Sequence, residues 1–189
     1  MTPLNRLNTC RLPGARSQIT QHSAISMIKR FLILSNLYPT DKTPFKGVFV
    51  KNIEQSLINS GVNVQRIVLA GRHNNKLIKV LHYITYIFRA FFRLLFTNRV
   101  VYLHYVAHSS IPYLLASSIR KLEMVAHVRG GDVMPSLDEP ENVRKIKVWI
   151  AKKALAKAAK IIVPSQYFKG FLIEEYGLCG TRIFVSPSG

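Results

Sequence analysis

The sequence predicts an α/β fold: a Rossmann-like parallel sheet with helices on both faces. From Arg30 onward, short apolar runs alternate with longer amphipathic stretches, and this alternation is typical of βαβ units. Most of these runs are apolar throughout, as parallel strands are when both of their faces are buried. A chain of 189 residues with 48% hydrophobic residues has the length and composition for one such domain with a buried core.

The expected strands are the runs richest in Val, Ile and Leu, and turn residues separate them from the expected helices. After the first run, a polar turn leads to Gly47 and to a helix that Gly61 ends, because glycine often follows the last turn of a helix. Ser165 is the expected cap of the last helix. Strands are expected at residues 31–34, 64–69, 100–106, 124–128, 160–164 and 182–185. Helices are expected at residues 50–59, 76–96, 111–121, 143–159 and 168–176.

Residues 1–26 contain no acid and no apolar periodicity, so we expect a disordered extension before a single domain at residues 27–189. Two origins of the extension stay open: a transit peptide, or a start codon placed too early, in which case Met27 is the natural start. The extension lacks the continuous apolar segment of a secretory signal. Cys10 and Cys179 have no metal-ligand spacing, and we expect both as free thiols in a reducing compartment.

The charge balance is unusual. Twenty-seven Lys and Arg residues against nine Asp and Glu residues give a net charge of +18, which favours an anionic partner such as nucleic acid, anionic lipid or a phosphorylated substrate. No acidic residue lies between Glu54 and Glu123. Nucleic acid is not the expected partner, because the sequence has no nucleic-acid-binding motif and a parallel sheet buried on both faces offers no aromatic stacking surface.

Residues 76–96 combine apolar side chains around most of a helix with a narrow basic stripe that includes Lys79, Arg89 and Arg93. Charges interrupt this segment before the roughly 20 apolar residues that a membrane span needs. Two interpretations stay open. The segment is either an ordinary buried helix with its stripe in water, or a helix at a membrane surface whose three cations bind anionic head groups.

Polar signals follow several predicted strands, at the edge where open α/β sheets bind ligands. After the first strand, Lys46 and Gly47 precede a helix whose N-terminus favours a phosphate, although glycine is also a common turn residue there. His104 and His108 follow the third strand, and histidine exchanges protons near neutral pH or binds phosphate when charged. Two histidines without a third ligand do not form a metal site, so no metal is expected.

The fourth predicted strand ends in a cation, two glycines and a carboxylate. His127 lies on the strand, and Arg129, Gly130, Gly131 and Asp132 follow it. This segment is either a ligand-binding loop or a turn with a surface ion pair.

The order of these segments resembles glycosyltransferase family 4. The matching segments are a strand with Leu-Tyr-Pro, a Lys-Gly-Val-Phe-Val loop into a helix, Arg-Gly-Gly-Asp, Ala-Lys-Ala-Ala-Lys-Ile-Ile-Val-Pro-Ser, and Arg-Ile-Phe-Val-Ser-Pro-Ser-Gly. The resemblance covers nearly all of residues 27–189. It implies the acceptor-binding N-terminal half of a GT-B fold, and a retaining transfer without a metal in the cleft against a second half that binds the nucleotide sugar.

The resemblance also implies roles for single residues. Gly47 matches a loop glycine that lies against the donor diphosphate when the two halves close. The segment from Arg129 to Asp132 matches a His-Gly-Ser-Asp turn beside the transferred sugar, so Arg129 and Asp132 are the expected catalytic residues. Arg129 replaces the histidine of that turn, and His127, two residues upstream on the same face, is the other candidate for the cleft. The expected substrate-binding set is Lys46, Gly47, His104, His108, His127, Gly130 and Gly131.

The donor-side residues of the family, including a pair of glutamates, belong after Gly189, and this chain has no such pair. We therefore expect a chain that ends before the donor-binding half, through truncation, a frameshift or a split gene, and that is inactive alone. The nucleotide sugar is an expected substrate, and no cofactor is expected.

The resemblance further implies bacterial surface-polysaccharide or lipid-linked glycan assembly, in the cytoplasm at the inner face of the plasma membrane. The expected partners are the donor-binding domain and an anionic membrane surface or lipid-linked glycan acceptor. The alternative function is a non-catalytic basic α/β module that binds anionic membrane or nucleic acid.

Overall fold

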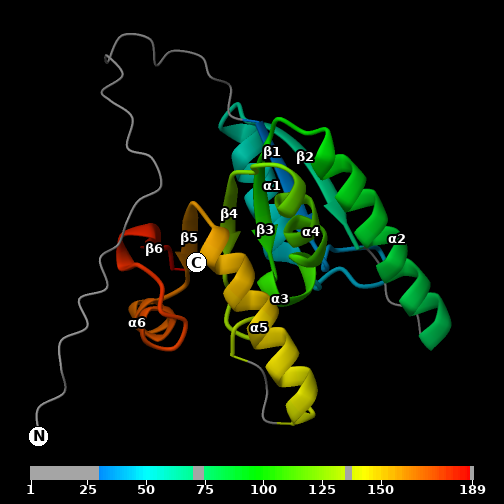
Figure 1. The fold of residues 1–189 in the computed structure, drawn as a ribbon. Coiled ribbons are helices and arrows are strands. Elements are labelled where there is room, and N and C mark those ends of the chain that lie inside the picture. Colours follow the sequence, from blue (N-terminus) through cyan, green and yellow to red (C-terminus); the bar gives the residue numbers. More distant parts are fainter. Residues whose placement is uncertain (1–29, 70–74, 135–137, 188–189) are drawn as a thin grey trace, which may run out of the picture.

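The computed structural model describes residues 30–69, 75–134 and 138–187, and the predicted extension at residues 1–26 lies outside them. Six parallel strands form one sheet in the order β2-β1-β3-β4-β5-β6 (Figure 1). This arrangement confirms the predicted α/β fold with a Rossmann-like parallel sheet. The strands are β1 (Arg30–Ser35), β2 (Asn63–Val68), β3 (Val100–His104), β4 (Met124–His127), β5 (Lys160–Val163) and β6 (Ile183–Val185).

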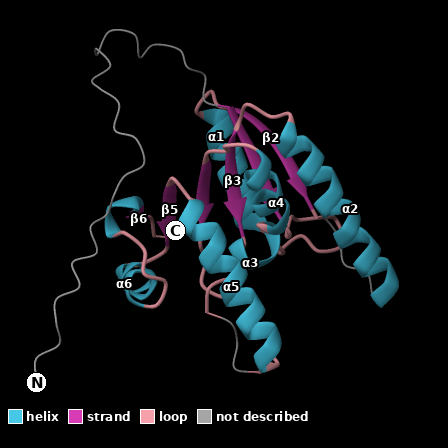
Figure 2. Ribbon diagram, in the orientation of Figure 1, coloured by secondary structure: helices cyan, strands magenta, loops and turns pink. Residues whose placement is uncertain are grey.

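Helices cover both faces of the sheet, but unequally (Figure 2). Side chains of α2, α4, α5 and α6 pack with β1, β3, β4 and β5 in one large apolar cluster, whereas α1 packs with the other face in a smaller cluster. The helices are α1 (Val48–Asn59), α2 (Lys76–Leu95), α3 (Val106–Ser109), α4 (Ile111–Ile119), α5 (Glu141–Lys157) and α6 (Gln166–Glu174), and a 3-10 turn, η1 (Gly180–Arg182), precedes β6.

The unequal cover follows from the handedness of parallel connections, which are nearly always right-handed. The step from β1 to β2 runs in one direction across the sheet, and every later step runs in the other. A right-handed crossover therefore places α1 on one face and the later helices on the opposite face. Part of the α1 face stays uncovered by a helix within the described ranges, and Phe184 of β6 is 49% exposed there.

Strand residues alternate between the two faces. Leu32, Leu34, Val101 and Leu103 are fully buried against the larger helical layer, while Ile33 and Tyr102 face α1. In the same alternation, His104 and His127 fall on the α1 face, at the carboxyl ends of β3 and β4. The strand register thus places two of the predicted site residues beside each other.

The predicted element boundaries agree within about two residues, but the short helix α3 was not predicted. The third strand was expected at residues 100–106, but it ends at His104 because Tyr105 adopts the left-handed backbone conformation, with φ at 56°. The short helix α3 follows directly. The expected turns are confirmed at Gly61, whose φ is 76°, and at Ser165, whose hydroxyl accepts a hydrogen bond from the N–H of Phe168 at 3.3 Å.

The expectation for the cysteines is wrong in part. Cys179 is disulfide-bonded, so it is not the free thiol that the low cysteine count suggested. Cys10 lies outside the described residues.

Candidate functional site

The sheet order places the crevice of an open α/β sheet, which is the point where the strand order reverses, between β1 and β3. The connection from β1 leaves on one face and the connection from β3 leaves on the other, and open α/β sheets bind ligands where neighbouring connections diverge in this way. The two loops meet here, since the N–H of Asn36 donates a hydrogen bond to the Ser109 hydroxyl at 2.9 Å. The candidate site lies on the α1 side of this crevice.

Five side chains form a ring cluster at the carboxyl ends of β3 and β4. The rings of His104 and His127 stack with centroids 5.2 Å apart, and Tyr102 lies 5.0 Å from His104. Phe49, from the first turn of α1, lies 6.0 Å from His104. The guanidinium of Arg129 sits over the Phe49 ring at 4.2 Å. The fold therefore brings together Arg129, His104 and His127, which the sequence predicted as site residues.

His104 is fully buried, and neither of its ring nitrogens has a hydrogen-bond partner within the described part of the chain. Burial lowers its pKa well below the ordinary value, and the neighbouring His127 and Arg129 lower it further. The imidazole is therefore neutral at pH 7. A buried polar group without a partner is uncommon and destabilising, and such groups concentrate at functional sites.

His127 has a defined partner, because its Nδ1 is hydrogen-bonded to the Tyr102 hydroxyl at 3.1 Å. Burial and the charge of Arg129 lower the pKa of His127 from 6.5 to about 4. At neutral pH it can bind a hydroxyl group without adding charge to the site. Arg129 is then the cation of the cluster.

Asp132 is buried, and backbone N–H groups occupy its carboxylate. One oxygen accepts from the N–H groups of Arg129 at 3.1 Å and Gly130 at 2.9 Å, and the other accepts from Val106 at 3.2 Å. Burial raises the pKa of Asp132, and these hydrogen bonds oppose the rise. The carboxylate thus joins the loop after β4 to the start of α3 and fixes the backbone at Arg129.

Gly47 is required by the fold itself. Its φ is 70°, and a Cβ at this position would lie 2.8 Å from the backbone carbonyl of Leu37. Gly130 is similar, with φ at 117° and the Phe168 ring 2.9 Å from a Cβ added there. A Cβ on Gly131 would meet no atom within 4 Å. The sequence predicted that Gly47 lets the backbone approach a phosphate. In the structure, the atoms packed closely against Gly47 are those of the Leu37 backbone.

The cluster borders a cavity of about 300 Å³ between α1 and the uncovered part of the sheet. Polar groups of several kinds line it, together with apolar side chains. The lining residues are Phe49, Asn52, Ile53, Ser56, Tyr102, His127, Arg129, Ile162, Ser186 and Pro187. Side-chain hydroxyl and amide groups beside one cation are suited to a ligand with several hydroxyl groups and an anionic group.

The remaining predicted residues lie elsewhere. His108 lies on the other side of the crevice, where burial and the nearby Lys147 lower its pKa. Lys46 is exposed in the loop before α1. The three cations assigned to a membrane are on α2, and two of them, Arg89 and Arg93, border a cavity of about 540 Å³ beside β2.

Three residue types at the site were not predicted: the aromatic pair Phe49 and Tyr102, the amide of Asn52, and the hydroxyls of Ser56 and Ser186. Tyr102 carried a usable signal, since it precedes His104 by two residues and must share its face of the sheet. Phe49 and Ser186 lie in the Lys-Gly-Val-Phe-Val and Arg-Ile-Phe-Val-Ser-Pro-Ser-Gly segments that resemble family 4, although their side chains were not assigned to the site. Asn52 and Ser56 come from within α1, where no local pattern marks them.

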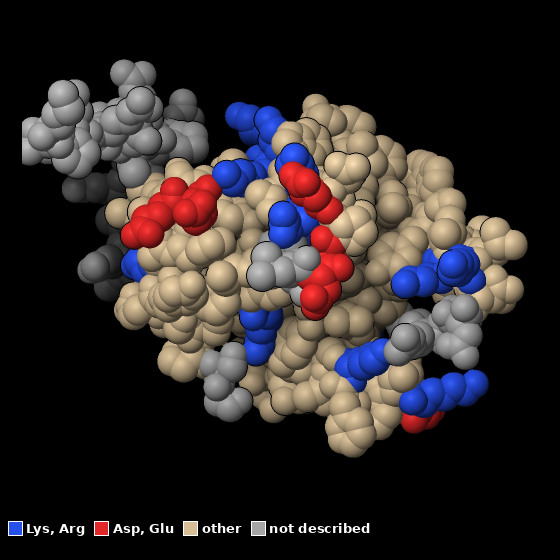
Figure 3. Space-filling model, turned by 90° about the horizontal axis from the view of Figure 1, so that it is seen from below, with Lys and Arg blue, Asp and Glu red and all other residues tan. Residues whose placement is uncertain are grey.

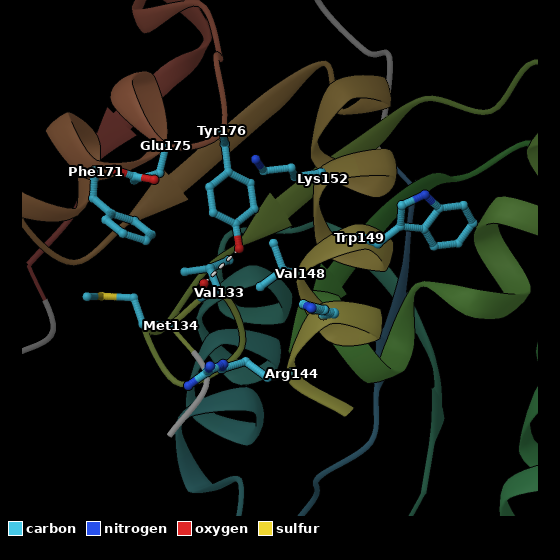
Figure 4. Close-up of a pocket in the computed structure, with 10 residues that line it drawn as sticks. Val133, Met134, Arg144, Val148, Trp149, Lys152, Phe171, Glu175 and Tyr176 are labelled. Atoms are coloured by element: carbon cyan, nitrogen blue, oxygen red, sulfur yellow. Dashed lines mark hydrogen bonds between the residues drawn. The ribbon is translucent and has the colours of Figure 1, made fainter. Parts of the chain in front are cut away.

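A second cavity, of about 620 Å³, lies between α5 and α6. Figure 4 shows Tyr176 between Phe171 and Lys152, whereas Trp149 lies on the other side of α5. The Tyr176 hydroxyl donates to the carbonyl oxygen of Val133 at 2.7 Å. Of its cations, Lys152 lies over the Tyr176 ring and Lys145 pairs with a glutamate of its own helix. This cavity contains none of the predicted site residues.

Figure 3 shows the carboxyl-end face of the molecule, where Lys and Arg side chains are scattered and Asp and Glu side chains gather mainly in two groups. This face carries no continuous basic surface in the part of the chain that is described.

The described ranges also hold no group of three His, Cys, Asp or Glu side chains placed to bind a metal. Across these same ranges, no helix has the length and hydropathy to cross a bilayer.

No protein-family model matches this chain, and no curated protein sequence matches it. The resemblance to glycosyltransferase family 4 therefore rests on the order of the sequence segments.

Proposed function

We propose that this chain is the acceptor-binding domain of a retaining nucleotide-sugar glycosyltransferase that acts on a surface polysaccharide or a lipid-linked glycan. The observation that carries the proposal is the cavity at the carboxyl ends of β3 and β4, where Arg129 and His127 meet the first turn of α1. The segments that resemble family 4 end at this edge of the sheet. The cavity lining also suits the ligand, since a sugar needs several hydrogen-bonding groups and a diphosphate needs a cation.

In this proposal Arg129 stabilises the negative charge of a phosphate group. The Phe49 ring beneath it and the Asp132 bond to its backbone N–H hold the guanidinium in place, so little side-chain freedom is lost when an anion binds. We assign Asp132 a positioning role, because its carboxylate oxygens already accept backbone hydrogen bonds. His127 and Tyr102 bind hydroxyl groups of the acceptor.

The N-terminus of α1 supports the same assignment. Its first turn contains no acidic residue, and no side chain caps it. Free N–H groups at a helix N-terminus favour an anion. Gly47, at the start of this helix, packs against the loop after β1 and so fixes the helix N-terminus beside Arg129.

Two measurements test the proposal. The chain is titrated with a short-chain prenyl diphosphate sugar, and binding is followed by NMR; Arg129→Ala is expected to weaken binding by about 1.5–3 kcal/mol, roughly ten- to hundredfold. Arg144→Ala, in the second cavity, is the matched control and is expected to bind like the wild type. Sugar transfer is expected only after a donor-binding half is fused behind Gly189. Equal binding by the two variants, or transfer by the chain alone, contradicts the proposal.

A further inference from the structure

The strand β2 ends the sheet on one side, and in the described ranges no strand pairs with its outer edge (Figure 1). The N–H of Leu69, directly after β2, donates to the carbonyl oxygen of Ser35 in β1 at 3.0 Å. Backbone groups of successive strand residues point to opposite sides, so Val64, Arg66 and Val68 direct their N–H and C=O groups away from β1. An edge of this kind is a template for a further strand.

A groove lies beside this edge, between β2 and α2. It consists of two neighbouring cavities of about 350 and 540 Å³, and Ile67 and Arg89 line both of them. We call the two cavities together the β2 groove. Its walls include apolar side chains such as Leu32 of β1 and Leu81 of α2. A strand added to the β2 edge would direct every second side chain toward α2, along this groove.

The β2 groove carries cations that its own elements do not balance. Arg93 donates to the amide oxygen of Gln65, which is neutral. Arg89, one turn earlier on α2, is exposed at the same cavity. No acidic residue occurs in β2, in α2 or between them. On the other face of β2, Arg66 is already bound to Glu54 of α1, so the unbalanced charge lies on the groove side.

Further arginines extend this charge toward the amino end of β2. The guanidinium of Arg99 donates to the backbone and side-chain oxygens of Asn63 at 3.0 and 2.7 Å. Burial lowers the pKa of Arg99, and the nearby Arg30 and Arg93 lower it further. Cations that lie together in this way favour an anionic partner.

We propose that the β2 edge binds an acidic, extended peptide segment of a partner protein as a further strand of the sheet. The peptide backbone pairs with the outward N–H and C=O groups of Val64, Arg66 and Val68. Its acidic side chains, at every second residue, enter the β2 groove and pair with Arg89 and Arg93. The backbone contacts hold the peptide extended, and the arginines select an acidic sequence.

The spacing of the two arginines matches that of a strand. Arg89 and Arg93 are four residues apart, which corresponds to about 6 Å along α2. Side chains on one face of a strand are two residues apart, which corresponds to about 7 Å. Since a helix that connects parallel strands runs antiparallel to them, acids at alternate peptide positions lie opposite the two arginines in turn.

Other occupants suit this edge less well. A chain of phosphate groups carries hydrogen-bond acceptors only, so it leaves the outward C=O groups of β2 without partners. A second copy of the chain would place the same arginines opposite each other across a two-fold axis. Residues 1–29 contain no acid, so the chain's own N-terminal segment lacks the required charge. The inference concerns the β2 edge alone and does not require the transferase proposal.

The test is fluorescence anisotropy of the full chain with a labelled eight-residue peptide in which Glu alternates with Thr, at about 0.15 M salt. Two further peptides carry N-methyl groups, one on every Glu and the other on every Thr. Their charge is unchanged, but each lacks the N–H groups of one edge. Because N–H groups of alternate residues point to opposite edges, only one of the two is expected to lose binding, by more than about tenfold. The other is expected to stay within about threefold of the unmethylated peptide.

Variants of the protein test the arginines. Arg89→Gln/Arg93→Gln is expected to weaken binding of the alternating peptide about tenfold, since each exposed ion pair contributes up to about fivefold. Lys153→Gln/Lys157→Gln is the matched control, because it removes two exposed cations with the same spacing from α5. It is expected to stay within about threefold of the wild type, since distant exposed charges are largely screened. Circular dichroism establishes that both variants are folded.

Amide hydrogen exchange locates the peptide on the protein. Exchange is expected to slow at Val64, Arg66 and Val68 when the peptide binds, and to change little at Gln65 and Ile67, which already face β1. Equal binding of the two methylated peptides, equal losses in the two protein variants, or unchanged exchange at the outward residues overturns the inference. Tighter binding of inorganic polyphosphate than of the alternating peptide overturns it as well. None of these measurements involves sugar binding, so failure here leaves the transferase proposal untouched.

Discussion

Lowering the pH from neutral is expected to destabilise this protein through the histidines of the ring cluster. The pKa of His127 falls from 6.5 to about 4 on folding, because the ring is buried and Arg129 is close. Between these two values the unfolded chain binds a proton that the folded chain does not. Stability is therefore fully present above about pH 6.5 and is lost as the pH falls toward 4.

The size of the effect follows from the same shift. The full difference corresponds to on the order of 3 kcal/mol, and about 2 kcal/mol of it is lost by pH 5. His104 acts in the same direction, since burial lowers its pKa even further. Asp132 acts in the opposite direction, because burial raises its pKa and its folded form gains stability as the pH falls.

The assay is urea unfolding at pH 7.5 and pH 5, followed by circular dichroism. His127→Gln keeps a group that can bond to Tyr102 but does not titrate, so its stability loss between the two pH values is expected to be about 2 kcal/mol smaller than that of the wild type. His82→Gln, on the exposed face of α2, controls for loss of a histidine and for the change in net charge. Equal losses in the wild type and His127→Gln would refute the reasoning.

Two further predictions concern the elements that hold the site. Gly47→Ala is expected to lower the free energy of unfolding by more than about 3 kcal/mol, because the new Cβ meets the Leu37 backbone at 2.8 Å; Gly61→Ala, with a similar φ and open space around it, is expected to lose about 1 kcal/mol. Urea unfolding of both variants checks this, and similar losses contradict it. Glu54→Gln is expected to lose about 1–3 kcal/mol, since buried Glu54 accepts from Arg66 at 2.8 Å and from the Tyr38 hydroxyl at 2.6 Å. The pKa of Tyr38, raised to about 12 by burial and by Glu54, should fall in an ultraviolet titration of that variant; an unchanged pKa argues against this contact.

The sheet was predictable because burial on both faces leaves a strong signal in the sequence. Most strands are apolar runs, although β2 contains Gln65 and Arg66. Some helix ends carry a residue with a local physical reason to be there, such as Gly61 or Ser165. The end of β3 was not predictable. Tyr105 takes a left-handed conformation that costs energy for a side chain of its kind, and the bond from the Val106 N–H to the distant Asp132 helps to hold it.

The candidate site was predictable only where its residues lie on strands. His104 and His127 are neighbours because the register pairs them across β3 and β4. The face of the sheet on which each side chain lies follows from the two-residue period of a strand. Phe49 and Asn52 come from α1, whose position depends on the crossover direction and on packing. The role of Asp132 was equally hidden, since the backbone N–H groups from which it accepts lie both in the loop after β4 and at the start of α3.

The handedness of the crossovers explains why the cavity lies where it does. Only the step from β1 to β2 places a helix on the α1 face, so β4, β5 and β6 present Val125, Ile162 and Phe184 beside α1 without a helix over them in the described ranges. The cavity lies at this border, and Ile162 is part of its wall. Any element or partner that covered Ile162 would therefore also cover part of the cavity wall beside Arg129. Access to the candidate site and cover of this half of the sheet are thus coupled by geometry, since Ile162 belongs to both surfaces.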